Sequence, residues 1–136
     1  MPVPLPRVLL LACALGLPQP SPRPTQPQVA RRFLLEVLAA DYQAAHHRLT
    51  PATRAALPLP AFARAVWPLW KQGQAHGQVI ELYQVGAWLG TPPQPTEWFC
   101  RFRFAADSLA PLPRPLFEVT FRDTASRQVQ GFRLRE

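Results

Sequence analysis

The chain is poor in asparagine, lysine and cysteine. Its 136 residues include no asparagine, a single lysine (Lys71) and two cysteines. Two cysteines are too few for a disulfide framework, and without asparagine there is no Asn-x-Ser/Thr glycosylation site. No apolar run approaches the roughly 18 residues that a membrane-spanning helix needs. The length then predicts one globular domain with a terminal extension.

The positive charge of the chain is carried almost entirely by arginine. Lysine and arginine number 15 against 8 acidic residues, which gives a net charge of +7. Abundant Arg, Ala, Pro and Leu with scarce Lys and Asn is the composition that GC-rich coding produces. The charge is therefore weak support for a nucleic-acid partner, and we do not expect one.

Residues 1–28 differ in composition from the rest and hold 8 of the 18 prolines. Arg7 precedes ten apolar residues (8–17), the layout of a secretory signal peptide. Within this run Leu-Leu-Ala-Cys resembles the lipobox of bacterial lipoproteins, with Cys13 as the lipidated residue. The alternating prolines that follow predict an extended spacer. We predict export to the periplasm or cell envelope, with membrane contact only through a lipid on Cys13; an N-terminus without targeting role is the alternative.

Helical patterns come next. Residues 29–49 contain no Gly or Pro, and their apolar residues recur at spacings of three, four and seven, which predicts one long helix. Thr50 suits an N-cap and Pro51 the first turn of a second, short helix. A third helix is expected over 60–67, because Pro68, directly after it, would kink or end the helix.

From residue 78 on, the hydrophobic pattern changes to a period of two. Four strands are expected over 78–89, 98–104, 116–123 and 128–135. Alternation directs one set of side chains of the second and third strands to the core: Trp98, Cys100, Phe102, Phe104, Phe117, Val119 and Phe121. It directs Glu118 and Thr120 to solvent. Three helices packed on one four-stranded antiparallel meander make an α+β domain over 29–136.

Two stretches carry a family resemblance. Ala39-Ala40-Asp41-Tyr42-Gln43-Ala44-Ala45-His46 in the first helix, followed by Leu49-Thr50-Pro51, resembles the nuclear-transport-factor-two-like superfamily, in particular small exported bacterial members of unknown function. The resemblance implies a cone-like fold in which a curved sheet wraps the long helix around a cavity. Its members include isomerases, dehydratases and transport adaptors, so the fold does not specify the function.

The residues offer little for catalysis. Enzymes of this superfamily carry an acidic or histidine base with a tyrosine or second acid, and Asp41 and Tyr42 match in type. As helix neighbours, however, they diverge by about 100 degrees. The inward strand positions hold no acid or histidine, and the three histidines lack metal-ligand spacing. We therefore expect no catalytic residue, metal or cofactor.

A binding role is the leading hypothesis. An apolar small ligand would contact Asp41, Tyr42, Trp67, Tyr83 and Trp98, although aromatics that only fill the core are the alternative. A second copy or an envelope protein would bind the outward arginines, Arg101, Arg103, Arg122, Arg133 and Arg135, although a solvated face with cross-strand pairs is the alternative there. The alternative function is an isomerase- or dehydratase-like enzyme using Asp41 with Tyr42 or Tyr83.

Overall fold

The computed structural model describes residue 16 and residues 22–136. The predicted leader, including Cys13, lies outside the described residues, as does the start of the proline-rich spacer. The helices are α1 (Gln26–Leu38), α2 (Tyr42–His47), α3 (Pro51–Ala56) and α4 (Leu59–His76), with one turn of 3-10 helix, η1 (Ala105–Asp107). The strands are β1 (Ile80–Trp88), β2 (Glu97–Phe104), β3 (Leu116–Phe121) and β4 (Gly131–Arg135).

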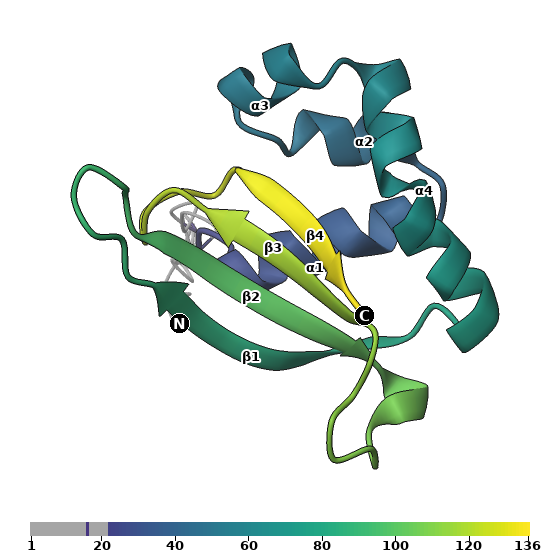
Figure 1. Cartoon of the computed structure of the whole chain (residues 1–136). Helices are drawn as coiled ribbons and strands as arrows, with labels where there is room; N and C mark the ends of the chain where they lie inside the picture. The colour runs from purple at the N-terminus through teal and green to yellow at the C-terminus, as the bar shows by residue number, and fades with distance from the viewer. Residues whose placement is uncertain (1–15, 17–21) are drawn as a thin grey trace, which may run out of the picture.

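The four strands form one antiparallel sheet in the order β1-β2-β3-β4, so each strand pairs with its neighbour in the sequence. Helix α1 lies along one face of this sheet, and α2, α3 and α4 gather beside its β4 edge (Figure 1). The prediction of an α+β domain built on a four-stranded antiparallel meander is confirmed. The helices of the described chain number four, where three were expected.

Helix α1 begins three residues before the expected domain start at Val29. Its N-terminus has a capping box: the Thr25 hydroxyl accepts from the backbone N–H of Gln28, and the Gln28 side chain accepts from the N–H of Thr25. Pro27 is accommodated because the first helical turn needs no backbone donor. The last residues of the predicted spacer are therefore helical.

The prediction of one long helix over residues 29–49 is wrong, because a break separates α1 from α2. Ala40 adopts a left-handed φ of +59°. Its N–H and that of Asp41 donate to carbonyls in the last turn of α1, which is the pattern of a Schellman C-cap. Asp41 then caps α2 by accepting from the N–H of Ala44 at 3.3 Å. An alanine in the left-handed position leaves no glycine in the sequence to mark the break.

Helix α3 starts as expected, because the Thr50 hydroxyl accepts from the N–H of Thr53 at 3.2 Å and Pro51 occupies the first turn. Helix α4 does not end at Pro68 but continues to His76, and Gly77, at φ +89°, follows it. An interior proline costs about 3 kcal/mol. Burial outweighs that cost, because apolar residues pack on both sides of the proline: Phe62, Val66 and Leu69.

The core lies between α1 and the sheet. Six phenylalanines are fully buried there: Phe33, Phe62, Phe102, Phe104, Phe117 and Phe121. The inward alternation predicted for β2 and β3 is confirmed at the four of them that lie on these strands, Phe102, Phe104, Phe117 and Phe121, and at Cys100 and Val119. The rings of Phe33 and Phe62 are 6.1 Å apart, and each lies 5.6 Å from Phe132 of β4. Side chains thus fill the space between α1 and the sheet.

Candidate functional site

The sheet face opposite α1 carries a continuous polar and aromatic surface, which we call the arginine face. Its central row runs across all four strands as direct partners, Gln84, Arg101, Glu118 and Arg133. Alternation places these residues on the side of the sheet away from the buried phenylalanines. Antiparallel register has therefore set an acid between two arginines.

Glu118 is the centre of this face. Its side chain has no exposed area. Its Oε2 atom accepts from Nε of Arg101 at 2.8 Å and from Nε of Arg135 at 3.1 Å. Its Oε1 atom lies 3.0 Å from Nε of Arg133. Three positive charges thus converge on one negative charge. The expectation that Glu118 and Thr120 meet solvent is wrong, because the neighbouring strands cover both side chains.

Opposing effects act on the Glu118 carboxyl. Burial raises its pKa, whereas hydrogen bonds from Arg101 and Arg135 and the charges of Arg135 and Arg133 lower it. The arginines outweigh burial, and the pKa of Glu118 lies below its ordinary value. Glu118 is therefore an ionised anchor for the arginines and not a proton donor near neutral pH.

Aromatic rings lie beside this charge cluster. The Arg101 guanidinium stacks over Phe99 at 4.4 Å and over Trp88 at 5.3 Å, and Arg135 lies 5.5 Å from the Trp88 ring. Phe99 is 6% exposed although it points away from the main core. Gly86 makes this possible, because a Cβ there would lie 2.7 Å from the Phe99 ring. The face therefore has a small hydrophobic core of its own.

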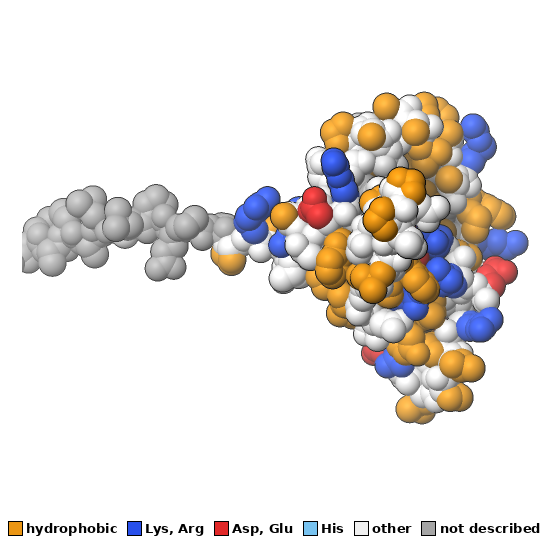
Figure 2. Space-filling view, turned by 60° about the vertical axis from the view of Figure 1, so that its left-hand side comes forward, with side chains coloured by type: hydrophobic (Ala, Val, Ile, Leu, Met, Phe, Trp, Pro, Cys, Tyr) orange, Lys and Arg blue, Asp and Glu red, His pale blue; other side chains and the backbone are white. Residues whose placement is uncertain are grey.

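Ion pairs continue toward the margins of the face. Arg133 reaches Glu97 at 3.2 Å, and Arg103 reaches Glu81 at 3.3 Å. A hollow of about 380 Å³ opens beside Trp88, Glu97 and Arg133, where the connection between β1 and β2 begins. Arg101, Arg103, Arg133 and Arg135 against Glu81, Glu97 and Glu118 leave the face with one net positive charge. In the view of Figure 2, basic side chains lie among hydrophobic ones, with few acidic ones between them.

The five residues predicted to contact an apolar ligand are not brought together. Tyr42 and Trp67 line one open hollow of about 380 Å³ with Ala63 and Arg64. Asp41 is an exposed cap residue beside Tyr42. Tyr83 lies on β1 at the opposite edge of the sheet from α2, with Arg103 at 5.7 Å from its ring. Trp98 of β2 packs partly buried against the main core.

Arg122 is also separate from the other arginines of the predicted partner surface. It follows β3 and lines a hollow with residues 50–53, whereas the Glu118 cluster lies within the strands.

Cys100 is buried in the core as expected, and burial raises the pKa of its thiol to about 11. Among residues 16 and 22–136, no helix is both long and apolar enough to cross a membrane, and no group of three or more potential metal ligands occurs.

Sequence reasoning did not assign Phe99 to the site, and it gave Glu118 the wrong exposure. Phe99 has the alternation of a solvent-facing position, yet it is buried under Arg101 and beside Trp88. The alternation of β3 likewise directs Glu118 to solvent, and its burial depends on arginines from the two neighbouring strands. Gly86 within β1 was the available signal, because a strand glycine often marks a close approach of another group.

No protein-family model, curated protein or solved structure matches this chain.

Proposed function

We propose that the domain is a non-catalytic binding module whose arginine face recognises an acidic protein partner. The observation that carries this proposal is Glu118, fully buried under three arginines on a sheet face that no described helix covers. An ordinary solvated face has no need to bury its central charge. The fold is proposed to be a member of the cone-like superfamily that the sequence resembles, and the partner is proposed to be in the cell envelope.

The composition of the face supports protein binding. Arginine and tryptophan are enriched at the energetic centres of protein interfaces. Trp88 is 45% exposed, and the hollow beside it can accept a side chain of a partner. Arg133 and Arg135 keep 47% and 42% of their side-chain area exposed while their Nε atoms are held by Glu118. The outer N–H groups of Arg135 make no hydrogen bond within the described residues, and Arg133 has N–H groups besides the one that donates to Glu97. Both arginines can therefore donate to a carboxylate of a partner.

Charge favours an acidic partner over a second copy of the chain. The whole chain carries a net charge of +7, and the arginine face itself is positive. Two such faces would repel one another, whereas an acidic surface would be attracted at long range. Glutamate or aspartate side chains of a partner would pair with the outer N–H groups of Arg133 and Arg135, with an apolar side chain against Trp88.

The positions of Asp41 and the tyrosines give the enzymatic alternative little support. Asp41 caps a helix through one carboxylate oxygen and is exposed. Tyr42 faces the hollow beside Trp67, and Tyr83 stacks with an arginine on β1. These three residues do not converge on a point where a substrate carbonyl could be polarised and deprotonated.

The proposal is tested by quantitative affinity capture from the envelope fraction of the source cells. Trp88→Ala removes the exposed aromatic ring beside Arg101 and Arg135. Trp67→Ala is the matched control, because Trp67 is 50% exposed but lies on α4. We expect a protein that the parent chain and the control capture equally and that Trp88→Ala loses, with binding weakened by added salt. Equal capture by both variants, or loss only with Trp67→Ala, would contradict the proposal.

A further inference from the structure

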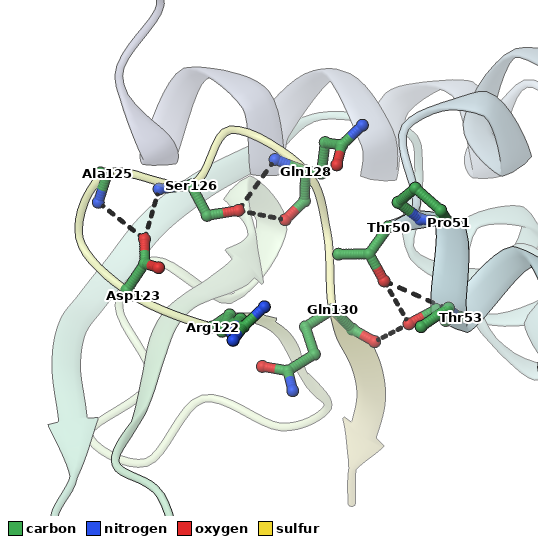
Figure 3. Close-up of a pocket in the computed structure, with 10 residues that line it drawn as sticks. Thr50, Pro51, Thr53, Arg122, Asp123, Ala125, Ser126, Gln128 and Gln130 are labelled. Carbon is green, nitrogen blue, oxygen red and sulfur yellow. Dashed lines mark hydrogen bonds between the residues drawn. The ribbon is translucent and has the colours of Figure 1, made fainter.

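A second candidate site lies away from the arginine face, between the start of α3 and the loop that joins β3 to β4. This hollow has a volume of about 730 Å³, within the range of small-molecule sites. Residues 50–53 form one wall and residues 122–130 the other (Figure 3). The walls are tied together, because the Thr53 hydroxyl donates to the carbonyl of Gln130 at 2.8 Å and the Thr50 N–H donates to the carbonyl of Val129 at 2.9 Å.

Gln130 carries an unsatisfied group at this hollow. Its Oε1 atom is buried and has no hydrogen-bond partner among the described residues. A buried acceptor without a donor is destabilising. Gln130 lines the hollow, so a donor on a ligand that reaches Oε1 would satisfy it. The side chain is thus suited to a ligand that carries an N–H group.

Two opposite charges lie in the same hollow. Arg122 forms no ion pair and no hydrogen bond within the described part of the chain, so its planar N–H groups are free for a carboxylate. Asp123 uses Oδ1 for the N–H groups of Ala125 and Ser126, at 3.0 and 2.7 Å. Its charge lies beside Arg122 in the hollow without pairing with it.

We propose that this hollow binds a small zwitterion, a free amino acid or a short peptide. Arg122 would pair with its carboxylate, and Asp123 and the Gln130 amide would accept from its ammonium group. A ligand with only one of these charges would leave the other side of the hollow unmatched. This site is independent of the arginine face.

The test is an NMR titration of the full chain with the dipeptide L-alanyl-L-alanine. We expect saturable shifts of the backbone amides of Thr53 and Ser126, which lie on opposite walls. The C-terminal amide of the dipeptide lacks the carboxylate, and its N-acetyl form lacks the ammonium group. Each analogue should bind at least about tenfold more weakly, because each loses a charge-assisted hydrogen bond. Absence of saturable shifts at millimolar dipeptide, or equal binding of either analogue, would overturn the proposal.

Variants assign the contacts. Arg122→Gln should bind the dipeptide and its C-terminal amide equally, because the group that distinguishes them is gone. Arg54→Gln makes the same charge change on α3 outside the hollow and should keep the discrimination. Gln130→Met keeps the shape but removes the unpaired acceptor, so it should weaken binding without lowering the melting temperature. Equal behaviour of Arg122→Gln and Arg54→Gln would refute the role of Arg122.

Discussion

Replacing Glu118 by glutamine tests whether a buried charge organises the arginine face. The change keeps the shape of the side chain and removes its negative charge, so Arg101, Arg133 and Arg135 converge on a neutral group. Breaking a fully buried ion pair costs about 3–5 kcal/mol. Exposed pairs contribute up to about 1 kcal/mol. Arg101 is 13% exposed, whereas Arg133 and Arg135 are 47% and 42% exposed. The free energy of unfolding should therefore fall by about 3 kcal/mol, at the low end of the buried range.

The measurement is urea or thermal unfolding followed by tryptophan fluorescence and circular dichroism. In a domain of this size such a loss lowers the melting temperature by more than about 10 °C. Glu97→Gln is the matched control, because Glu97 is 38% exposed and contacts a single arginine. It should cost less than about 1 kcal/mol. If the two substitutions lower the free energy of unfolding equally, the buried charge does not organise the face.

The stability difference between the parent chain and Glu118→Gln should also depend on pH. Folding lowers the pKa of Glu118 from its ordinary value of 4.5. The folded carboxyl therefore stays ionised at pH values where the unfolded chain already binds a proton. Its stabilisation is complete above the unfolded pKa and is lost as the pH falls through the lower folded pKa. The stability difference between the parent chain and Glu118→Gln should be constant from pH 6 to 7 and shrink below about pH 4. A difference that grows on acidification would refute the assignment.

Three further changes follow from the geometry. Ala40→Gly should raise the free energy of unfolding by about 0.5–1 kcal/mol, because φ is +59° there and only glycine adopts it without strain; a loss of stability in urea unfolding would contradict this. Gly86→Ala should cost about 1–3 kcal/mol by displacing the Phe99 ring, and much less in a Phe99→Ala background, as a double-mutant cycle would measure. In a Cys13→Ser background, Cys100 should react with iodoacetamide at pH 9 only after denaturation, because burial raises its pKa to about 11; rapid labelling of the folded protein would contradict its burial.

Local patterns in the sequence predicted the sheet well. Period-two alternation located all four strands, and the strand order is the simplest that short connections allow. Thr50 and Pro51 marked the start of α3, because capping is a local property. The break before α2 was not predictable in this way. Its left-handed residue is Ala40, which carries no signal, and Asp41 could serve equally as an interior helix residue or as a cap.

The candidate site required information that no single strand contains. Alternation gives the side of the sheet to which Arg101, Glu118 and Arg133 point, but only the register makes them direct neighbours. Phe99 shows the same limit, since its burial depends on Gly86 in β1, thirteen positions earlier. Sequence reasoning therefore placed Arg101, Arg103, Arg133 and Arg135 on the face correctly. It also included Arg122, which lies apart from them, and it assigned the wrong solvent exposure to Glu118.

The register also bears on the binding role that we propose for this face. A free surface arginine loses side-chain entropy when it binds. Arg101 has already lost that freedom, because Glu118, Gln84 and the Phe99 ring hold its guanidinium on three sides. Arg135 donates from Nε to the same carboxylate, and Arg133 forms an ion pair with it at 3.0 Å and donates to Glu97 from an outer N–H group. A partner therefore meets donors at fixed positions, and substitution of Glu118 should weaken binding even though Glu118, being buried, never touches the partner.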